Sequence, residues 1–202
     1  MIEFQCPNCS RAFTVPDTYA GKRARCKGCG NELRVPEPAV AAPPPPPARP
    51  PLRVRRLMAD AEVMRKTFAN TPHIRIESTV GDPPEIYRIV FKIDSLERDA
   101  KGKPQPRREH VAEVQLGADY PRLPPVCRML TPIFHPNIDP AYVCIGDHWT
   151  AGERLVDLVV RLAEMIAYQA YNIRSPLDGE AAMWADLNTE KLPTDARPMQ
   201  PT

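Results

Sequence analysis

The sequence predicts an α+β domain, in which helices pack on an antiparallel sheet, preceded by a much smaller cysteine-rich domain. Three observations lead to this prediction. Two Cys-x-x-Cys motifs lie in the first 36 residues, a Pro-rich stretch follows, and the rest of the chain runs in the order helix, strands interrupted by a long loop, and two helices. A chain of 202 residues is long enough for one ordinary domain and one small one.

Composition narrows the class of protein. The net charge is +2, with 27 basic residues nearly balanced by 25 acidic ones, which disfavours a nucleic-acid coat or a membrane-surface protein. No apolar run is long enough to cross a bilayer, and the opening residues MIEFQCPNCSRAF lack the basic-then-apolar pattern of a signal peptide. We therefore expect a cytoplasmic protein without a membrane partner, whose six cysteines serve metal binding or catalysis before disulfides.

Residues 1–36 carry the pattern of a four-cysteine zinc ribbon. Cys6 and Cys9 form one Cys-x-x-Cys motif, Cys26 and Cys29 form a second, and sixteen residues separate the two. Each pair of thiolates can hold one edge of a tetrahedral zinc ion. Because four thiolates leave no open coordination position, the sequence predicts one structural Zn²⁺ and not a catalytic one. So short a domain buries little core, and metal binding would supply its folding energy.

The ligand of this ribbon stays open. Its six basic residues outnumber its three acidic ones, a bias that could indicate nucleic acid. No aromatic residues alternate with the basic ones to stack on bases, however. This pattern disfavours nucleic acid and favours protein docking or a merely solvated surface.

Residues 37–51, EPAVAAPPPPPARPP, form a Pro-rich linker. Proline fixes φ and removes the backbone donor, so this stretch can neither pair as a strand nor coil into an α-helix. It fits a semi-rigid polyproline spacer, and it could also serve as a ligand for an aromatic-lined groove. Its place between two segments that are expected to fold favours the spacer.

Residues 52–187 begin with a helix and a strand meander. Leu52–Ala69 has apolar residues at helical spacing, and the basic surface between Arg53 and Lys66 suits either docking or plain solvation. Four segments rich in β-branched and aromatic residues predict four antiparallel strands: 73–80, 86–93, 110–116 and 126–130. Asp94–Arg108 is polar and contains glycine and prolines, and we expect it to be a long loop.

Two helices close the predicted domain. The first is expected to begin at Thr150, where Thr150 and Glu153 fit a capping box. Its apolar face would hold Leu155, Leu158, Val159, Leu162 and Ile166, and its polar stripe Asp157, Arg161, Glu164 and Tyr168. The last helix is expected from about Asp178 to Leu187, and residues 188–202 are expected to be a disordered tail.

The two cysteines outside the ribbon have different surroundings. Cys127 lies inside the strand-like VCRML, where a cysteine is usually a small buried residue. Cys144 lies in PIFHPNIDPAYVCIGDHW, a stretch rich in turn formers, where a side chain is more accessible. The residues alone leave Cys144 open as a nucleophile or as a small apolar residue. His148 could act as its base, although a histidine four residues away is a weak signal.

Residues 52–187 resemble ubiquitin-conjugating enzymes. Motifs of that family occur in order: Tyr-Pro, Pro-Pro, Thr-Pro, His-Pro-Asn, the cysteine, a tryptophan and Ser-Pro-Leu followed by Glu-Ala-Ala. The resemblance implies the fold of that family, an antiparallel four-stranded meander with flanking helices. It also implies an acyltransferase that carries the C-terminal glycyl group of ubiquitin or a ubiquitin-like modifier as a thioester on Cys144.

The resemblance further implies roles and partners. Asn137 would stabilise the oxyanion or hold the active-site loop, His135 would support that loop, and Ser175 would stand where an acidic residue often orients the incoming amine. An activating enzyme would supply the modifier, and a lysine of a target protein or a ligase would receive it. If the basic surface between Arg53 and Lys66 is used for docking, the resemblance implies that it contacts the activating enzyme.

Departures from the family pattern leave one alternative. Asn137 and Cys144 are one residue closer than is common, and the uncharged Ser175 leaves amine orientation to Asp147 or Asp178. The zinc ribbon and these departures are typical of a divergent bacterial-type member. The alternative is a non-catalytic module of the same fold, which binds a ubiquitin-like protein or scaffolds an assembly.

Overall fold

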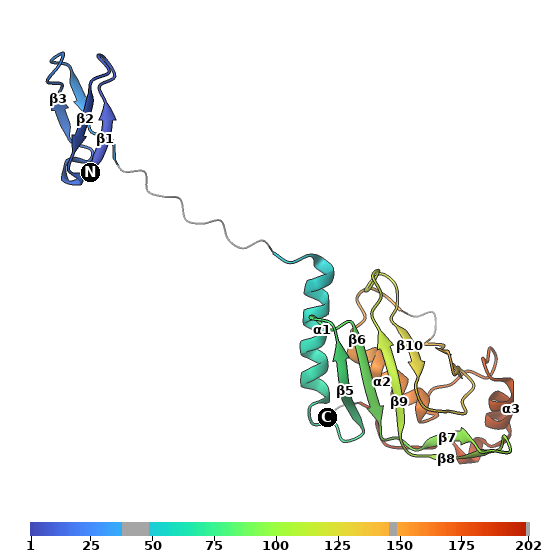
Figure 1. The fold of residues 1–202 in the computed structure, drawn as a ribbon. Helices are drawn as coiled ribbons and strands as arrows, with labels where there is room; N and C mark the ends of the chain where they lie inside the picture. Colours follow the sequence, from blue (N-terminus) through green and yellow to red (C-terminus); the bar gives the residue numbers. More distant parts are fainter. Residues whose placement is uncertain (38–48, 146–148, 201–202) are drawn as a thin grey trace. The chain divides into compact units, whose positions relative to one another are not determined.

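The computed structural model describes residues 1–37, 49–145 and 149–200 (Figure 1). Most of the predicted linker therefore lies outside the described residues. The chain divides into two compact units, Met1–Ala48 and Arg49–Thr202. No helix among the described residues is long and apolar enough to span a membrane.

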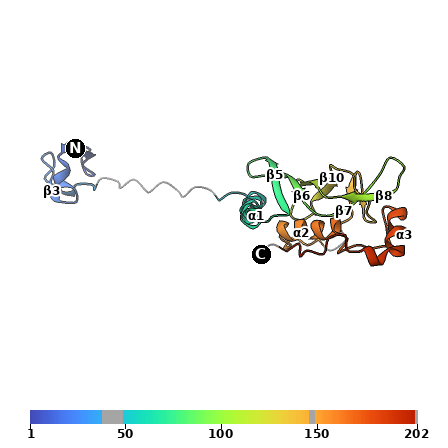
Figure 2. The same ribbon diagram turned by 90° about the horizontal axis from the view of Figure 1, so that it is seen from below.

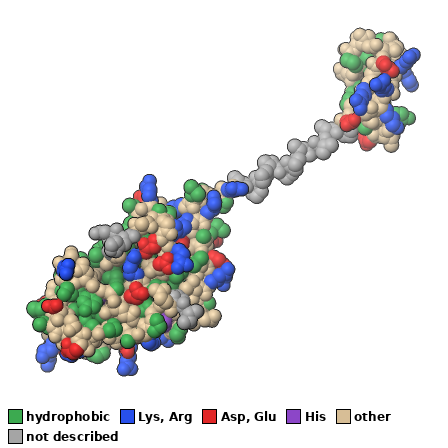
Figure 3. All heavy atoms as spheres, turned by 180° about the vertical axis from the view of Figure 1, so that it is seen from behind, with side chains coloured by type: hydrophobic (Ala, Val, Ile, Leu, Met, Phe, Trp, Pro, Cys, Tyr) green, Lys and Arg blue, Asp and Glu red, His purple; other side chains and the backbone are tan. Residues whose placement is uncertain are grey.

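The first unit consists of two short antiparallel hairpins. Their strands are β1 (Ile2–Gln5) with β2 (Ala12–Val15), and β3 (Arg23–Arg25) with β4 (Glu32–Arg34); a 3₁₀ turn, η1 (Asp17–Tyr19), lies between the hairpins. Its small core joins two cysteines to apolar side chains: Cys6, Cys26 and Leu33 are buried, with Phe4 and Phe13 packed against them. Lys and Arg side chains project from the face of this unit that Figure 3 shows. Ile2 and Val35 are the other buried apolar residues among those described in this unit.

The second unit contains a four-stranded antiparallel sheet in the order β10–β9–β6–β5. Its strands are β5 (Ile74–Val80), β6 (Ile86–Phe91), β9 (His110–Gln115) and β10 (Val126–Met129). Successive side chains point to opposite faces, which explains why alternating apolar residues in these segments end in the core. The predicted α+β meander is confirmed, with strand ends that differ from the predicted ones by a few residues at most.

Three α-helices flank this sheet: α1 (Leu52–Phe68), α2 (Leu155–Ile166) and α3 (Gly179–Leu187). Figure 2 shows α2 beneath one face of the sheet, α1 beside β5, and α3 beyond the opposite end. Helix α2 is buried around most of its circumference, including Leu155, Leu158, Val159, Leu162 and Ile166 as predicted. Asp178 caps α3 by accepting a hydrogen bond from the N–H of Ala181 at 3.0 Å, as N-cap aspartates commonly do.

The predicted loop Asp94–Arg108 instead forms a β-hairpin of β7 (Ser95–Arg98) and β8 (Pro104–Arg107). Pro104 and Pro106 alternate along β8, so both can direct the missing N–H away from β7 and leave the ladder intact. An ion pair between Arg107 and Glu97, at 2.6 Å, ties the two strands together. The loop prediction for residues 94–108 was wrong because it took the prolines as a sign of a loop and did not consider that they alternate along a strand.

Helix α2 departs from the expectation at both ends. It begins at Leu155, and the expected capping box is not formed, because the Glu153 carboxylate pairs with Arg161 at 2.7 Å. Tyr168, expected on the polar stripe, is only 1% exposed and has a positive φ of 56° just after the helix ends. A left-handed residue turns the chain away from the helical direction, which carries this side chain from the expected surface into the core.

The expectation of a disordered tail also differs from the structure over residues 188–200. A 3₁₀ turn, η2 (Thr189–Lys191), follows α3, and Met199 is only 1% exposed within the main core. Asp195 accepts a hydrogen bond from the N–H of Asp94 at 3.1 Å and pairs with Arg197. The contact between Asp94 and Asp195 joins residues 101 positions apart, so the local composition carried no sign of it. Residues 201–202 lie outside the described residues.

Candidate active site and metal centre

The four ribbon cysteines converge on one point. All four sulfur atoms lie within 4.8 Å of one another. The Sγ atoms of Cys6 and Cys29 are 3.8 Å apart, and those of Cys9 and Cys26 are 3.6 Å apart. A tetrahedron with zinc–sulfur bonds of about 2.3 Å has edges of about 3.8 Å, so the spacing fits a zinc ion.

The backbone around these cysteines favours thiolates. The two motifs fold into equivalent turns, in which the residues after Cys9 and Cys29 have positive φ: Ser10 at 57° and Gly30 at 74°. Hydrogen bonds from the backbone of Asn31 and the side chain of Asn8 lower the pKa of Cys29 to about 6. A backbone hydrogen bond from Arg11 lowers the pKa of Cys9, but hydrogen bonds with Cys29 and Cys26 raise it to about 12. Metals bind the deprotonated thiol, so metal binding at this site would release protons.

Cys144 lies at the end of a small hairpin. Its strands are β11 (Ile138–Asp139) and β12 (Tyr142–Val143), and the N–H of Cys144 continues the ladder by donating to the carbonyl of Asn137 at 3.0 Å. Ile138 and Val143 anchor the hairpin in the core, whereas the Cys144 side chain is half-buried. A cysteine that is both fixed and accessible meets the first requirement of a nucleophile.

Asn137 fastens this hairpin to the segment before α3. Its side-chain amide donates to the carbonyl of Asn172 at 2.8 Å, and its Oδ1 accepts from the N–H of Asn172 at 2.6 Å. The residue is 5% exposed. An amide nitrogen carries two hydrogens, so one N–H is left for another acceptor after this pair forms.

His135 holds the same loop from inside the protein. It is fully buried, its Nδ1 accepts from the N–H of Asn137 at 3.1 Å, and its ring meets that of Tyr168 edge to face at 4.6 Å. Burial lowers its pKa to about 3, and the backbone of Met165 opposes this only in part. A ring with so low a pKa that is also closed to solvent is a weak and inaccessible base, which agrees with loop support and not with base catalysis.

The buried histidines predict a loss of stability in acid. The pKa of His135 falls from 6.5 to about 3 and that of His110 to about 4, in both cases because of burial. Below pH 6.5 only the unfolded state gains their protons, so the free energy of unfolding should fall as the pH drops toward these values. The slope should be about 1.4 kcal/mol per pH unit for each histidine.

Urea unfolding of the full chain between pH 7 and 4.5 measures this slope. The variant His135→Asn keeps an acceptor for the N–H of Asn137 and removes the titrating ring. Its slope should therefore be lower than that of the wild type by about 1.4 kcal/mol per pH unit. An unchanged slope in this variant contradicts the assignment of His135 as a neutral buried group.

The segment between Asn172 and α3 runs beside the cysteine loop. The N–H groups of Leu177 and Asp178 donate to the carbonyl of Pro136 at 2.7 and 3.1 Å. Ser175 is exposed, and its side chain makes no hydrogen bond with the described residues. The structure thus brings His135, Asn137 and Cys144 together, with Ser175 on the adjoining loop.

Asp178, one of the two acids expected to orient an amine in place of Ser175, has a carboxylate that is engaged within the fold. Both of its carboxylate oxygens accept from Nη2 of Arg98, at 2.8 and 3.1 Å, and Nη1 of Arg98 pairs with Glu180 at 2.6 Å. The same carboxylate caps α3. With these contacts it already has a structural role. Asp147 and His148, the other expected participants, lie outside the described residues.

The sequence reasoning missed two residues of this region. The backbone of Asn172 is the partner of Asn137, and Arg98 of the β7–β8 hairpin holds the start of α3. No local signal marked either residue, because their partners lie 35 and 80 positions away. The guanidinium of Arg98 also lies over the Phe134 ring at 4.5 Å, a cation–π contact that joins the inserted hairpin to the start of the cysteine loop.

Much of the basic surface of α1 is used within the fold. Arg53 pairs with Glu85 at 2.8 Å, and Arg56 bonds both the buried Asp60 at 2.7 Å and the carbonyl of Ala151 at 2.6 Å. These contacts tie the helix to loops of the same unit. They reduce the basic surface that remains for a docking partner.

The fold is a four-stranded meander with flanking helices. It carries a half-buried cysteine on a loop that a His-Pro-Asn turn holds in place, and these features together define the class of protein. The sequence model for the family described as ubiquitin-conjugating enzyme matches residues 88–198. The chain belongs to this family. Its members generally act as transferases, and generally bind ubiquitin-like modifiers, activating enzymes and ligases.

One solved structure agrees with this fold. It is described as a ubiquitin-conjugating enzyme from Trypanosoma cruzi, and it superimposes with a TM-score of 0.50 at 17% identity. The match covers 69% of this chain and 94% of the other. At this identity the likeness shows the fold alone.

Proposed function

We propose that the protein carries ubiquitin or a ubiquitin-like modifier as a thioester on Cys144 and transfers it to a lysine amine or to a ligase. The observation that carries this proposal is the position of Cys144. It is half-buried at the end of a hairpin, and its N–H is bonded to the residue that pins the loop to the segment before α3. A merely structural cysteine needs no such exposure.

The chemistry follows from the thiol. The Cys144 thiolate attacks the thioester carbonyl presented by the activating enzyme, a new C–S bond forms, and the thiolate of that enzyme leaves. Because one thiol replaces another, no strong activating base is required. In the second step an uncharged lysine amine attacks, the Cys144 thiolate leaves, and the amine proton passes to solvent. The free N–H of Asn137 is the donor that we assign to the oxyanion.

The ribbon is proposed to hold one structural zinc ion through Cys6, Cys9, Cys26 and Cys29. We propose that residues 1–36 form this ribbon, that 37–51 link it to the catalytic domain, and that this domain runs from residue 52 past the expected end at 187 to include residues 188–200, which pack on it.

A charging assay tests the proposal. The purified full chain would be mixed with its activating enzyme, its modifier and ATP, and would be separated on gels with and without thiol. We expect a heavier band that disappears when thiol is added. If the activating enzyme is itself charged and this band never forms, the proposal is contradicted.

The second candidate is the non-catalytic binding module. Ser175 is exposed and uncharged, and the nearby Asp178 is occupied by Arg98. Among the described residues of the segment before α3, no free carboxylate remains to orient an amine. Modifier binding without any thiol-sensitive band would favour this candidate.

The proposed role of Asn137 predicts a selective defect. In Asn137→Ala the charging yield should stay near that of the wild type, because charging depends on the thiol. Discharge to free lysine should fall by about 100-fold, the loss typical for one oxyanion donor. The free energy of unfolding should fall by roughly 1–3 kcal/mol, because two hydrogen bonds to the backbone of Asn172 are lost, at about 0.5–1.5 kcal/mol each.

Single-turnover discharge of the charged protein measures the first effect, and urea unfolding measures the second. Asn137→Asp is the matched variant, since its carboxylate still accepts from the N–H of Asn172 and donates nothing. A normal discharge rate in both variants would leave Asn137 with a structural role only.

A further inference from the structure

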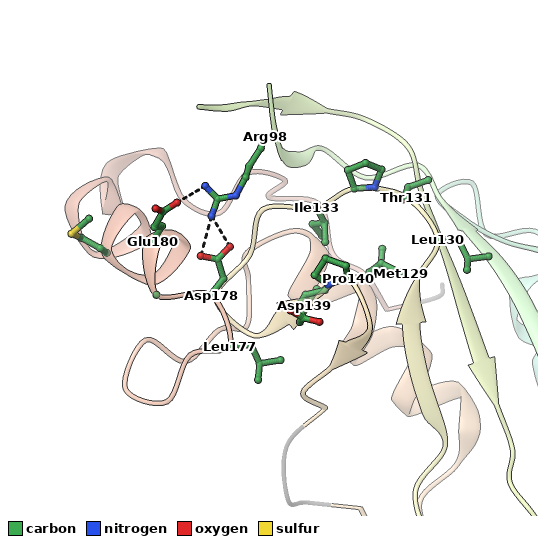
Figure 4. A pocket seen from close by; sticks show the side chains of 14 residues that line it. Arg98, Met129, Leu130, Thr131, Ile133, Asp139, Pro140, Leu177, Asp178 and Glu180 are labelled. Carbon is green, nitrogen blue, oxygen red and sulfur yellow. Dashed lines mark hydrogen bonds and ion pairs between the residues drawn. The ribbon is translucent and has the colours of Figure 1, made fainter. Parts of the chain in front are cut away.

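A groove with a volume of about 930 Å³ lies beside the cysteine hairpin (Figure 4). One wall comes from the end of β10 and the chain after it, and another from the start of α3. Apolar side chains line much of it, including Leu130, Ile133, Leu177 and Met183. Three of these are well exposed: Leu130 at 40%, Leu177 at 44% and Met183 at 62%.

The hairpin that carries Cys144 also contributes to the groove. Ile138, Asp139 and Pro140 line it, and the hairpin then returns through β12 to the cysteine. Asp139 pairs directly with Tyr142 across the hairpin. The groove is therefore lined by the same two-stranded hairpin that carries Cys144.

Alternation along the hairpin places Asp139 on the side of the cysteine. Asp139 and Tyr142 are exposed, whereas Val143 is fully buried. Because successive side chains alternate, Cys144 lies on the same face as Tyr142. Residues diagonal across an antiparallel pair lie about 7–8 Å apart, so the carboxylate of Asp139 is within reach of an amine that approaches Cys144.

The charges of the groove are unequal. Its charged lining residues are three acids, Asp139, Asp178 and Glu180, and one base, Arg98. Arg98 is engaged by Asp178 and Glu180. Asp139 lies outside this cluster; its Oδ1 accepts from the N–H of Ala141 at 2.9 Å, which leaves its second oxygen available. A segment with apolar and basic side chains complements such a groove.

We propose that this groove docks the acceptor segment of the target protein, with an apolar side chain in the groove and Asp139 positioning the neighbouring lysine and its basic flank. This inference rests on the proposed function, because it names the acceptor for the same thioester. The apolar residue enters between Leu130 and Met183. Asp139 thereby provides the negative charge that attracts the lysine amine, which the uncharged Ser175 cannot provide.

The test separates acceptor choice from thioester formation. The full-length protein would be charged without an activating enzyme, by a short peptide thioester that ends in Gly-Gly and has mercaptoethanesulfonate as its leaving group. Mass mapping would place the adduct on Cys144. The adduct would then be discharged either by hydroxylamine or by an acceptor peptide that contains one lysine. The peptides carry leucine or serine before this lysine, and arginine or glutamate after it.

We expect the Leu-Lys-Arg-Arg peptide to discharge the thioester about tenfold faster than the Glu-flanked or Ser-preceded peptides. Asp139→Asn keeps the acceptor for the N–H of Ala141, and it should lose the preference for arginine over glutamate among the acceptor peptides. Met183→Ser should lose the preference for leucine. Leu187→Ser is the matched control, because Leu187 is 72% exposed on the same helix and lies outside the groove. The arginine preference should weaken in high salt.

Each result is decisive. Hydroxylamine discharge with no peptide preference in the wild type overturns the groove proposal and leaves the proposed function standing. A preference that survives both Asp139→Asn and Met183→Ser also overturns it. Failure of Cys144 to accept the peptide thioester contradicts the proposed function itself, and the groove proposal with it.

Discussion

Replacement of Cys144 by alanine is expected to abolish the thiol-sensitive adduct completely. Alanine has no nucleophile, and the proposed transfer has no route without the thiolate. The measurement is the charging assay, run with the activating enzyme in excess and read on non-reducing gels. Hairpin packing should survive, because Cys144 is only half-buried and the hairpin is anchored by Ile138 and Val143.

Cys127→Ala is the matched control. Cys127 is 1% exposed, and burial raises its pKa to about 12, so its thiol is neither accessible nor ionised at neutral pH. This variant should charge like the wild type, although the small cavity should reduce the free energy of unfolding by roughly 1 kcal/mol. An adduct that survives in Cys144→Ala and vanishes in Cys127→Ala would contradict the assignment of the nucleophile.

Removal of zinc is expected to unfold the ribbon and leave the larger unit folded. The ribbon core consists of two cysteines and a few apolar side chains, which is too little to hold so short a chain without a metal. Structural zinc contributes on the order of 10–16 kcal/mol in comparable small domains. Amide NMR spectra of the full chain, recorded before and after chelation, would follow both units at once.

The loss should be selective and stoichiometric. About one zinc ion per chain should be released, resonances from residues 1–37 should collapse to unfolded positions, and those from the sheet should remain. Cys26→Ser should show the same collapse without chelation. Cys144→Ala, which removes one thiol outside the ribbon, should retain a full zinc content. Unchanged ribbon resonances after complete zinc release would contradict the structural role.

Local patterns were sufficient for the elements that depend on neighbouring residues. The four strands of the meander follow from alternating apolar residues, and the family follows from a series of short motifs in order. Each signal lies within a few residues of the structure that it predicts. The four ribbon cysteines likewise converge as their paired spacing indicated.

The amino-acid sequence alone was therefore enough to predict the fold class, the family and the cysteine cluster. The contacts that hold the Cys144 loop, and the groove beside that loop, depended on tertiary packing. Asn137 meets Asn172, Arg98 meets Asp178, and Asp94 meets Asp195 across 35, 80 and 101 positions. The same applies to the groove, whose walls come from β10, the cysteine hairpin and α3. Periodicity and capping report only on residues that are close along the chain. Contacts between distant segments arise when the sheet and helices pack, so only the folded chain shows them.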